Sequence, residues 1–213
     1  MSIHYPSLDS INQDLSFYKQ AQLLIVTKNQ NDDDVQKLLL DGYRLFGENR
    51  VQEAQKKFNS HIRKNYPNLN LHLIGPLQSN KAKLALSIFH CIQSIDRKKL
   101  IDQIVKEIKN IDFILTKEFY IQINIGHESQ KAGVLPENLT YLYEYALTCN
   151  LNITGLMCIP PISTNPGIFF EEMQILKEKL NKNLKLSMVM SNDYKIALKN
   201  NSNLIRVGSK IFK

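Results

Sequence analysis

The stretch LLIVTK at residues 23–28 begins with four apolar residues and ends in a lysine. A strand that is hydrophobic on successive residues is normally buried on both faces, as in a parallel sheet. A lysine that closes such a strand lies at the mouth of the sheet. Partial burial there would disfavour the ammonium form and lower the pKa, as a lysine that forms a Schiff base requires. The alternative is that Lys28 only ends the strand and extends into solvent.

Strand-like and helix-like patterns alternate along the rest of the chain. Strands that are separated by helices imply right-handed crossovers and a parallel sheet. With residues 23–28 the strand-like runs number eight, which predicts an α/β fold, a single (β/α)8 barrel of the TIM type. The other strand-like runs are 45–47, 71–74, 90–94, 119–124, 153–159, 185–190 and 204–207. The helix-like segments are 33–40, 51–64, 81–89, 98–109, 136–149, 168–180 and 193–199, with 8–19 as an extra, short N-terminal helix.

The composition is that of an ordinary soluble domain, with 213 residues of which 43% are hydrophobic and 22% charged. No repeat, low-complexity stretch or Gly/Ser linker divides the chain, so residues 1–213 are predicted to form one domain. The net charge of +7 comes from lysines that are scattered through helical stretches and mixed with Glu and Asn. Solvated helix faces explain this distribution better than a groove that follows phosphates, so we expect no nucleic-acid partner.

The three cysteines, Cys91, Cys149 and Cys158, lack metal-site spacing and leave one unpaired in any disulfide scheme. We expect them to be reduced thiols in a protein without a metal site. The polar N-terminus does not resemble a signal peptide, and no apolar stretch is long enough to span a bilayer. The sequence therefore predicts a cytoplasmic protein with no membrane partner.

The ends of the seventh and eighth predicted strands carry groups that suit a phosphate. Ser191 stands where the seventh strand leads into a helix, so its hydroxyl and free backbone N–H groups converge at a positive helix end. After the eighth strand, Gly208 permits close backbone approach and Ser209 offers a hydroxyl. Phosphate sites in such barrels frequently form from these two loops. A phosphate held there, beside Lys28 on the adjacent first strand, suits a phosphorylated aldehyde such as pyridoxal 5'-phosphate.

Arg206 lies two residues before Gly208, so its side chain is predicted to point into the barrel with that glycine. The guanidinium could then face the pyridine nitrogen of the cofactor. Because arginine stays cationic, it would keep that nitrogen unprotonated and weaken the cofactor as an electron sink. The alternative is a salt bridge inside the barrel.

Polar residues also follow other predicted strands, among them Asn49, Ser79 and Asp96. Each could instead cap the helix that follows it. Taken together, the segments at the strand ends resemble those of the pyridoxal phosphate homeostasis protein family, whose fold is that of the N-terminal barrel domain of alanine racemase. The resembling segments include VTK (26–28), FGEN (46–49), HLIGPLQSNK (72–81), SID (94–96), GLM (155–157), SM (187–188), MS (190–191) and IRVGS (205–209).

The resemblance implies that Lys28 carries the Schiff base of pyridoxal 5'-phosphate and that Arg206 lies beside the pyridine nitrogen. The residues implied as phosphate binders are Ser191, Gly208 and Ser209. The residues implied as lining the pocket are Asn49, His72 and Met188. The chain departs from the family pattern at Val189, where glycine is usual, and at Lys213, which replaces a glycine.

Two functions from different classes fit these residues. The favoured one is a protein that is not an enzyme, holds pyridoxal 5'-phosphate as a Schiff base and takes part in intracellular vitamin B6 homeostasis. The alternative is an amino-acid racemase of the alanine racemase type, which usually needs a base on each face of the substrate. In alanine racemase the opposite base comes from a second domain, which we do not expect here. A Schiff-base aldolase acting on a phosphorylated sugar is a third possibility. The expected partners are the cofactor and pyridoxal-phosphate-dependent apo-enzymes, and the expected state is a monomer.

Overall fold

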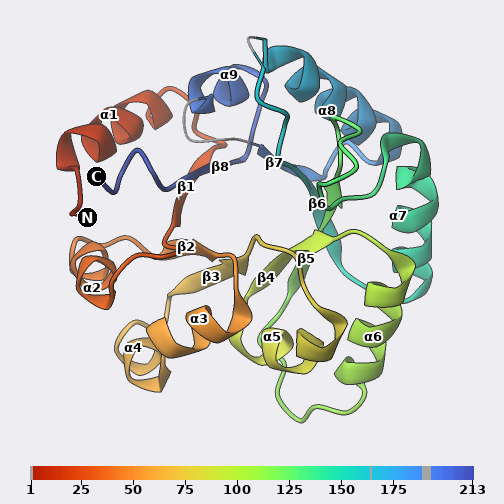
Figure 1. Ribbon diagram of the computed structural model, residues 1–213, viewed down its shortest axis with the longest axis horizontal. Helices are drawn as coiled ribbons and strands as arrows, with labels where there is room; N and C mark the ends of the chain where they lie inside the picture. Colours follow the sequence, from red (N-terminus) through yellow and green to blue (C-terminus); the bar gives the residue numbers. More distant parts are fainter. Residues whose placement is uncertain (1, 164, 189–192) are drawn as a thin grey trace.

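The structure is a computed structural model that describes residues 2–163, 165–188 and 193–213. Eight parallel strands follow one another around a closed barrel, and the last pairs with the first. Helices surround the barrel on its outside (Figure 1). The α/β barrel that the alternating pattern predicted is therefore confirmed. The strands are β1 (Gln22–Val26), β2 (Leu45–Glu48), β3 (Asn70–Leu73), β4 (Cys91–Ile95), β5 (Glu118–Ile123), β6 (Ile153–Cys158), β7 (Lys185–Met188) and β8 (Leu204–Val207).

The helices occupy the connections that the sequence assigned to them. Within the described residues, none of them combines the length and the apolar character that crossing a bilayer requires. The α-helices are α1 (Tyr5–Leu15), α2 (Asp32–Leu40), α3 (Val51–Lys57), α4 (Ser60–Asn65), α5 (Ala82–Ile88), α6 (Lys98–Ile108), α7 (Leu139–Thr148), α8 (Gly167–Leu180) and α9 (Tyr194–Lys199). Two short 3-10 turns, η1 (Ser79–Lys81) and η2 (Pro136–Asn138), precede α5 and α7.

Some predicted boundaries differ from the structure for local reasons. The helix predicted over 51–64 is two helices, because Asn59 has extended backbone and its side chain accepts a hydrogen bond from the Ile62 N–H at 3.2 Å, which starts α4. The N-terminal helix begins before residue 8, at Tyr5, with a proline in its first turn. The first strand ends at Val26, so Thr27 and Lys28 belong to the loop that follows it.

The main hydrophobic core lies between the barrel and its helices, because side chains of a barrel strand alternate between the helix layer and the interior. On β1, Ile25 belongs to this outer core, whereas Leu24 and Val26 pack inside the barrel with Ile74. A second interior cluster fills the barrel between other strands, so the interior is packed with side chains. It consists of Cys91, Tyr120, Met157 and Leu204.

Candidate functional site

A cavity of about 760 Å³ opens at the carboxyl end of the barrel. Because all eight strands are parallel, the loops that follow them meet at this end. Several of the residues that the sequence proposed for a cofactor site share its walls. They are Lys28, Asn49, Arg206, Gly208 and Ser209.

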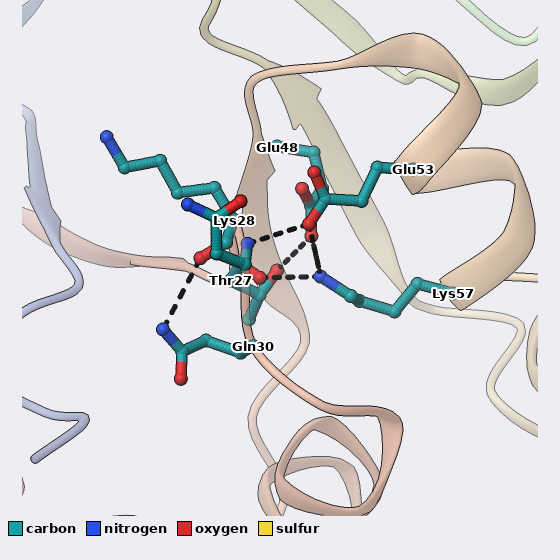
Figure 2. A network of polar contacts seen from close by, with 7 residues as sticks. Thr27, Lys28, Gln30, Glu48, Glu53 and Lys57 are labelled. Carbon is teal, nitrogen blue, oxygen red and sulfur yellow. Dashed lines mark hydrogen bonds and ion pairs between the residues drawn. The ribbon is translucent and has the colours of Figure 1, made fainter. Parts of the chain in front are cut away.

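Lys28 stands two residues beyond the end of β1 and is exposed. The partial burial expected from the sequence is therefore corrected, because the protein alone leaves this side chain open to solvent at the cavity. The preceding residue, Thr27, is held by a backbone hydrogen bond. The Thr27 N–H donates to the Gly47 carbonyl at 3.0 Å, which continues the contact between β1 and β2. Figure 2 shows the Lys28 side chain extending away from a polar network behind Thr27.

Lys57 of α3 stands at the centre of this network, and its side chain is only 3% exposed. Its Nζ donates to the Thr27 carbonyl at 2.6 Å, to Glu48 Oε1 at 2.8 Å and to Glu53 Oε1 at 3.1 Å (Figure 2). Burial raises the pKa of Glu48, although Lys57 acts in the opposite direction. Burial would also raise the pKa of Glu53, but hydrogen bonds from the Asn29 N–H and Lys57 outweigh it and lower that pKa.

Arg206 of β8 lies inside the barrel, buried to 6% exposure, as its spacing from Gly208 predicted. Its hydrogen bonds include those to the Ser187 carbonyl at 2.6 Å, to Ser187 Oγ at 2.8 Å and to the Cys158 carbonyl at 2.6 Å. Burial lowers the pKa of Arg206 to about 10, so the guanidinium remains a cation at neutral pH. The cavity therefore has a fixed positive charge at its wall.

A chain of hydrogen bonds continues from Arg206 across the barrel interior. The Ser187 hydroxyl donates to Gln93 Oε1 at 2.6 Å, and Gln93 Nε2 lies 2.7 Å from His72 Nδ1. His72 Nε2 lies 3.1 Å from Asn70 Oδ1. Burial lowers the pKa of His72 to about 3, so its neutral ring can accept at Nδ1 and donate at Nε2. Each member then donates to the next, from Arg206 to Asn70.

Two predicted site residues, His72 and Met188, are not among the described residues that line this cavity. His72 lines a smaller cavity of about 240 Å³ at the amino ends of the strands. Met188 faces the helix layer and is fully buried in the outer core. The structure therefore does not bring these two side chains together with Lys28, since His72 lies near the amino end of its strand and Met188 faces the helix layer. Ser191, a predicted phosphate binder, falls outside the described residues.

Gly208 is buried where β8 passes close to β1. A Cβ atom at this position would lie 3.0 Å from the Val26 carbonyl oxygen and 3.1 Å from Val26 Cβ. The close backbone approach predicted for this glycine is therefore present, and the neighbouring strand is what it approaches. Ser209, the next residue, is exposed at the cavity. The backbone of Asn49 also lies close to a glycine. A Cβ atom at Gly75 would lie 2.3 Å from the Asn49 carbonyl oxygen.

Comparison with known proteins places these residues in a family. The sequence profile of the alanine racemase N-terminal domain matches residues 10–213. A pyridoxal phosphate homeostasis protein from Aquifex aeolicus is 35% identical over 203 residues, which cover 90% of this chain and 86% of that protein. One from Helicobacter pylori is 34% identical over 200 residues, covering 91% and 87%. This chain belongs to the pyridoxal phosphate homeostasis protein family.

Solved structures agree with membership of the homeostasis protein family. PipY of Synechococcus elongatus without PLP matches with a TM-score of 0.87 at 29% identity, covering 98% of this chain and 99% of that one. The structure of PipY with PLP bound matches with a TM-score of 0.83 over the same shares. Alanine racemase from Acinetobacter baumannii matches with a TM-score of 0.75 at 14% identity, covering 99% of this chain and 62% of that one. The last likeness is one of fold.

In this member of the homeostasis protein family, Lys57 and Gln93 lie behind the cavity wall and were not predicted from the sequence. Lys57 follows Ala54 by three positions, which places it on the buried face of α3. Gln93 is a polar residue in the completely buried strand β4. A charged or amide side chain at a core position is the signal that could have found both residues.

Proposed function

We propose that this chain binds pyridoxal 5'-phosphate in the cavity at the carboxyl end of the barrel. It holds the cofactor as a Schiff base on Lys28 and takes part in intracellular vitamin B6 homeostasis. The observation that carries the proposal is that Lys28, Arg206, Gly208 and Ser209 line one cavity. The names of the curated relatives and the structure of PipY with PLP bound support it.

The cavity fits such a cofactor in size and chemistry. Its volume of about 760 Å³ lies within the usual range of cofactor sites, roughly 300–1,000 Å³. Gln122 of β5 also lines the cavity, and its Nε2 donates to the Ala132 carbonyl at 2.9 Å. Among the described residues, the buried Gln122 Oε1 has no hydrogen-bond partner. A buried acceptor at the wall suits a ligand with a hydroxyl group, which pyridoxal 5'-phosphate carries.

The residues of the chain divide the work of holding the cofactor. Bound pyridoxal 5'-phosphate would supply an aldehyde, and its condensation with the Lys28 amine would form one C=N bond and release one water. Arg206 presents its cation to the pyridine nitrogen. Gly208 and Ser209 offer backbone N–H groups and a hydroxyl to the phosphate, together with Ser191, and Asn49 closes the wall. We assign no catalytic residue and no metal ligand.

We further propose that the chain is not an enzyme. The support is that the curated relatives are named as homeostasis proteins, whereas the likeness to alanine racemase, at 14% identity, is one of fold. We also propose that the chain forms one domain and acts as a cytoplasmic monomer that exchanges the cofactor with pyridoxal-phosphate-dependent apo-enzymes. The buried free thiols of Cys91 and Cys158 are compatible with a reducing compartment.

Absorption spectra of the purified protein with pyridoxal 5'-phosphate, before and after borohydride reduction, test the proposed function. We expect a near-visible band that reduction abolishes, and we expect Lys28→Ala to lose it while staying folded. Lys37→Ala, which removes an exposed lysine on α2, is the matched control and should keep the band. A colourless wild-type protein, or a Lys28→Ala variant with an unchanged band, would contradict the proposal.

A further inference from the structure

The peptide groups on both sides of Lys28 are hydrogen-bonded to α3. On one side, the Thr27 carbonyl accepts a hydrogen bond from Lys57 Nζ at 2.6 Å. On the other side, the Asn29 N–H donates to Glu53 Oε1 at 2.7 Å. Lys57 Nζ and Glu53 Oε1 are 3.1 Å apart and form an ion pair. The pair therefore holds the backbone both before and after Lys28. We call Glu48, Glu53 and Lys57 the α3 clamp.

The hydrogen-bonding capacity of the Lys57 ammonium is fully used in this clamp. An ammonium group has three donors, and Lys57 Nζ has three acceptors, on Thr27, Glu48 and Glu53. Glu48 is completely buried and also accepts from the Thr27 hydroxyl at 2.7 Å. Thr27 is therefore held through its carbonyl and its side chain at the same time.

Stability alone does not explain a buried charged group at this position. Burying ions is expensive, and replacing a buried ion network by apolar residues of similar volume is often neutral or stabilising. α3 already packs on the core through Val51 and Ala54. The clamp differs from apolar packing in being directional, because it fixes the orientation of two specific peptide groups.

The backbone turns sharply after Lys28. Asn29 has a φ of 59°, in the left-handed region that asparagine adopts more readily than other residues with a side chain. The hydrogen bond from its N–H to Glu53 holds this turn in place. The turn and the fixed Thr27 carbonyl together set the direction in which the Lys28 side chain leaves the backbone. It extends away from the clamp (Figure 2) and lines the cavity.

We propose that Lys57 and Glu53 are positioning residues that orient the exposed Lys28 for condensation with the cofactor aldehyde. The inference rests on the proposed function, in which the Lys28 amine forms the C=N bond and one water leaves. The Lys28 side chain is exposed, so its backbone anchor is what limits the directions in which the amine can lie. Misplacement of a reacting group by about 1 Å can cost roughly a hundredfold in rate.

Glu53→Ala is the main test variant, because Glu53 is 25% exposed and its loss leaves Lys57 paired with the buried Glu48. We expect Schiff-base formation with pyridoxal 5'-phosphate to slow by at least about tenfold, as followed by stopped-flow absorbance. Glu53→Gln should restore most of the rate, since its amide oxygen can accept from the Asn29 N–H. Lys57→Met removes the hydrogen bond to the Thr27 carbonyl and should slow Schiff-base formation at least as much.

Binding of pyridoxine 5'-phosphate separates positioning from structural damage. This vitamer carries an alcohol in place of the aldehyde, so it occupies the same cavity without condensing. Its affinity should change by less than about twofold in Glu53→Ala, because Glu53 does not line the cavity and acts independently of the groups that do. Lys56→Ala, an exposed neighbour of Lys57 on α3, should leave both the condensation rate and this affinity unchanged.

The outcomes distinguish this inference from the proposed function. An unchanged condensation rate in both Glu53→Ala and Lys57→Met would overturn it, and so would a parallel loss of pyridoxine 5'-phosphate affinity. A wild-type protein that binds pyridoxine 5'-phosphate but forms no reducible adduct would instead contradict the Schiff base, and with it this role for the clamp. Slow condensation with intact vitamer binding, rescued by Glu53→Gln, supports the inference.

Discussion

Lys28 and Arg206 face the same cavity in opposite states of hydration. The Lys28 side chain is exposed, whereas Arg206 is 6% exposed and fixed by hydrogen bonds to Ser187 and Cys158. An accessible amine suits a covalent bond that must form and be released. A buried cation with fixed partners suits a group that only has to present one charge in one direction.

The hydrogen-bond chain behind Arg206 gives a prediction for Gln93→Leu. The variant removes the hydrogen bonds that link Ser187 to His72, so Arg206, which we propose to face the pyridine nitrogen, loses part of its support. We expect the affinity for pyridoxal 5'-phosphate to fall about tenfold, equivalent to about 1.4 kcal/mol for a charge-assisted contact. Titration with an analogue that has C–H in place of the pyridine nitrogen should show little change.

Ser94→Ala is the control for Gln93→Leu. Ser94 is buried beside Gln93 on β4, and its hydroxyl has no hydrogen-bond partner within the described part of the chain. The affinities of the Ser94→Ala variant for pyridoxal 5'-phosphate and for the analogue should match those of the wild type. Equal losses of the cofactor and of the analogue in Gln93→Leu would show that the variant damages the cavity in general and would count against a role through Arg206.

Neutral burial of His72 predicts that acid destabilises the protein. Its pKa is about 3 in the folded state, against about 6.5 for an unperturbed histidine. The folded state therefore binds fewer protons than the unfolded chain, so stability is fully present above pH 6.5 and falls as the pH drops toward 3. The loss by about pH 4 is of the order of 3 kcal/mol. Urea unfolding of wild type and His72→Gln across this range measures it.

His72→Gln keeps an acceptor for Gln93 and a donor for Asn70 but does not titrate, so its stability should depend less on pH. His61→Gln, which changes an exposed histidine on α4, should follow the wild-type curve. Identical pH dependence in wild type and His72→Gln would show that His72 is not the group responsible.

How well the sequence located a residue depended on where the residue stood in its strand. The meeting of Lys28, Arg206 and Gly208 at one cavity could be predicted because strand ends meet at one end of a parallel barrel. The places of His72 and Met188 could not, because whether a side chain within a strand faces the interior or the helix layer changes with a single residue of register. Their sequence shows a strand but does not show its register or depth.

Elements were easier to predict from the sequence than the contacts between them. Eight apolar runs separated by amphipathic segments identify the strands and most helices, because burial on both faces imposes a simple pattern. The break between α3 and α4 depends on one capping side chain, Asn59, inside a continuous helical pattern. The position of Lys57 under the loop after β1 depends on how α3 packs on the barrel, which no local pattern reports.

The N-terminal helix α1 provides a prediction at the scale of the element. Leu8 and Ile11 on α1 are 1% and 0% exposed, whereas Phe17 just beyond the helix is 78% exposed. Leu8→Ala should lower the free energy of unfolding by about 3 kcal/mol, as for other buried leucines. Phe17→Ala should change it by less than about 0.5 kcal/mol. Urea unfolding of the two variants tests this, and comparable losses would contradict packing of α1 on the barrel.

For the whole molecule, barrel closure is what builds the site. β1 pairs with β8, with Ile25 opposite Val207, and this register brings the loop that carries Lys28 beside the loop that carries Gly208. The chain ends lie together as well (Figure 1), since the Ser2 N–H donates to the Lys213 carbonyl at 2.8 Å. Residues from the two ends of the chain share the cavity only after closure.

A binding protein with this site should not be an efficient racemase. Incubation with L-alanine in D₂O should give no D-alanine beyond the amount that free pyridoxal 5'-phosphate produces at the same concentration. Slow deuterium exchange with retained configuration would fit a single base at Lys28. Chiral chromatography and mass spectrometry measure both quantities. Rapid appearance of D-alanine would favour the racemase alternative.

The proposed function depends on covalent attachment of the cofactor to Lys28. Peptide mapping by mass spectrometry, after loading the wild-type protein with pyridoxal 5'-phosphate and reducing it with borohydride, shows which lysine is attached. We expect a reduced adduct on the peptide that contains Lys28, at close to one per chain. An adduct found chiefly on another lysine, such as Lys131 in the same cavity, would contradict it.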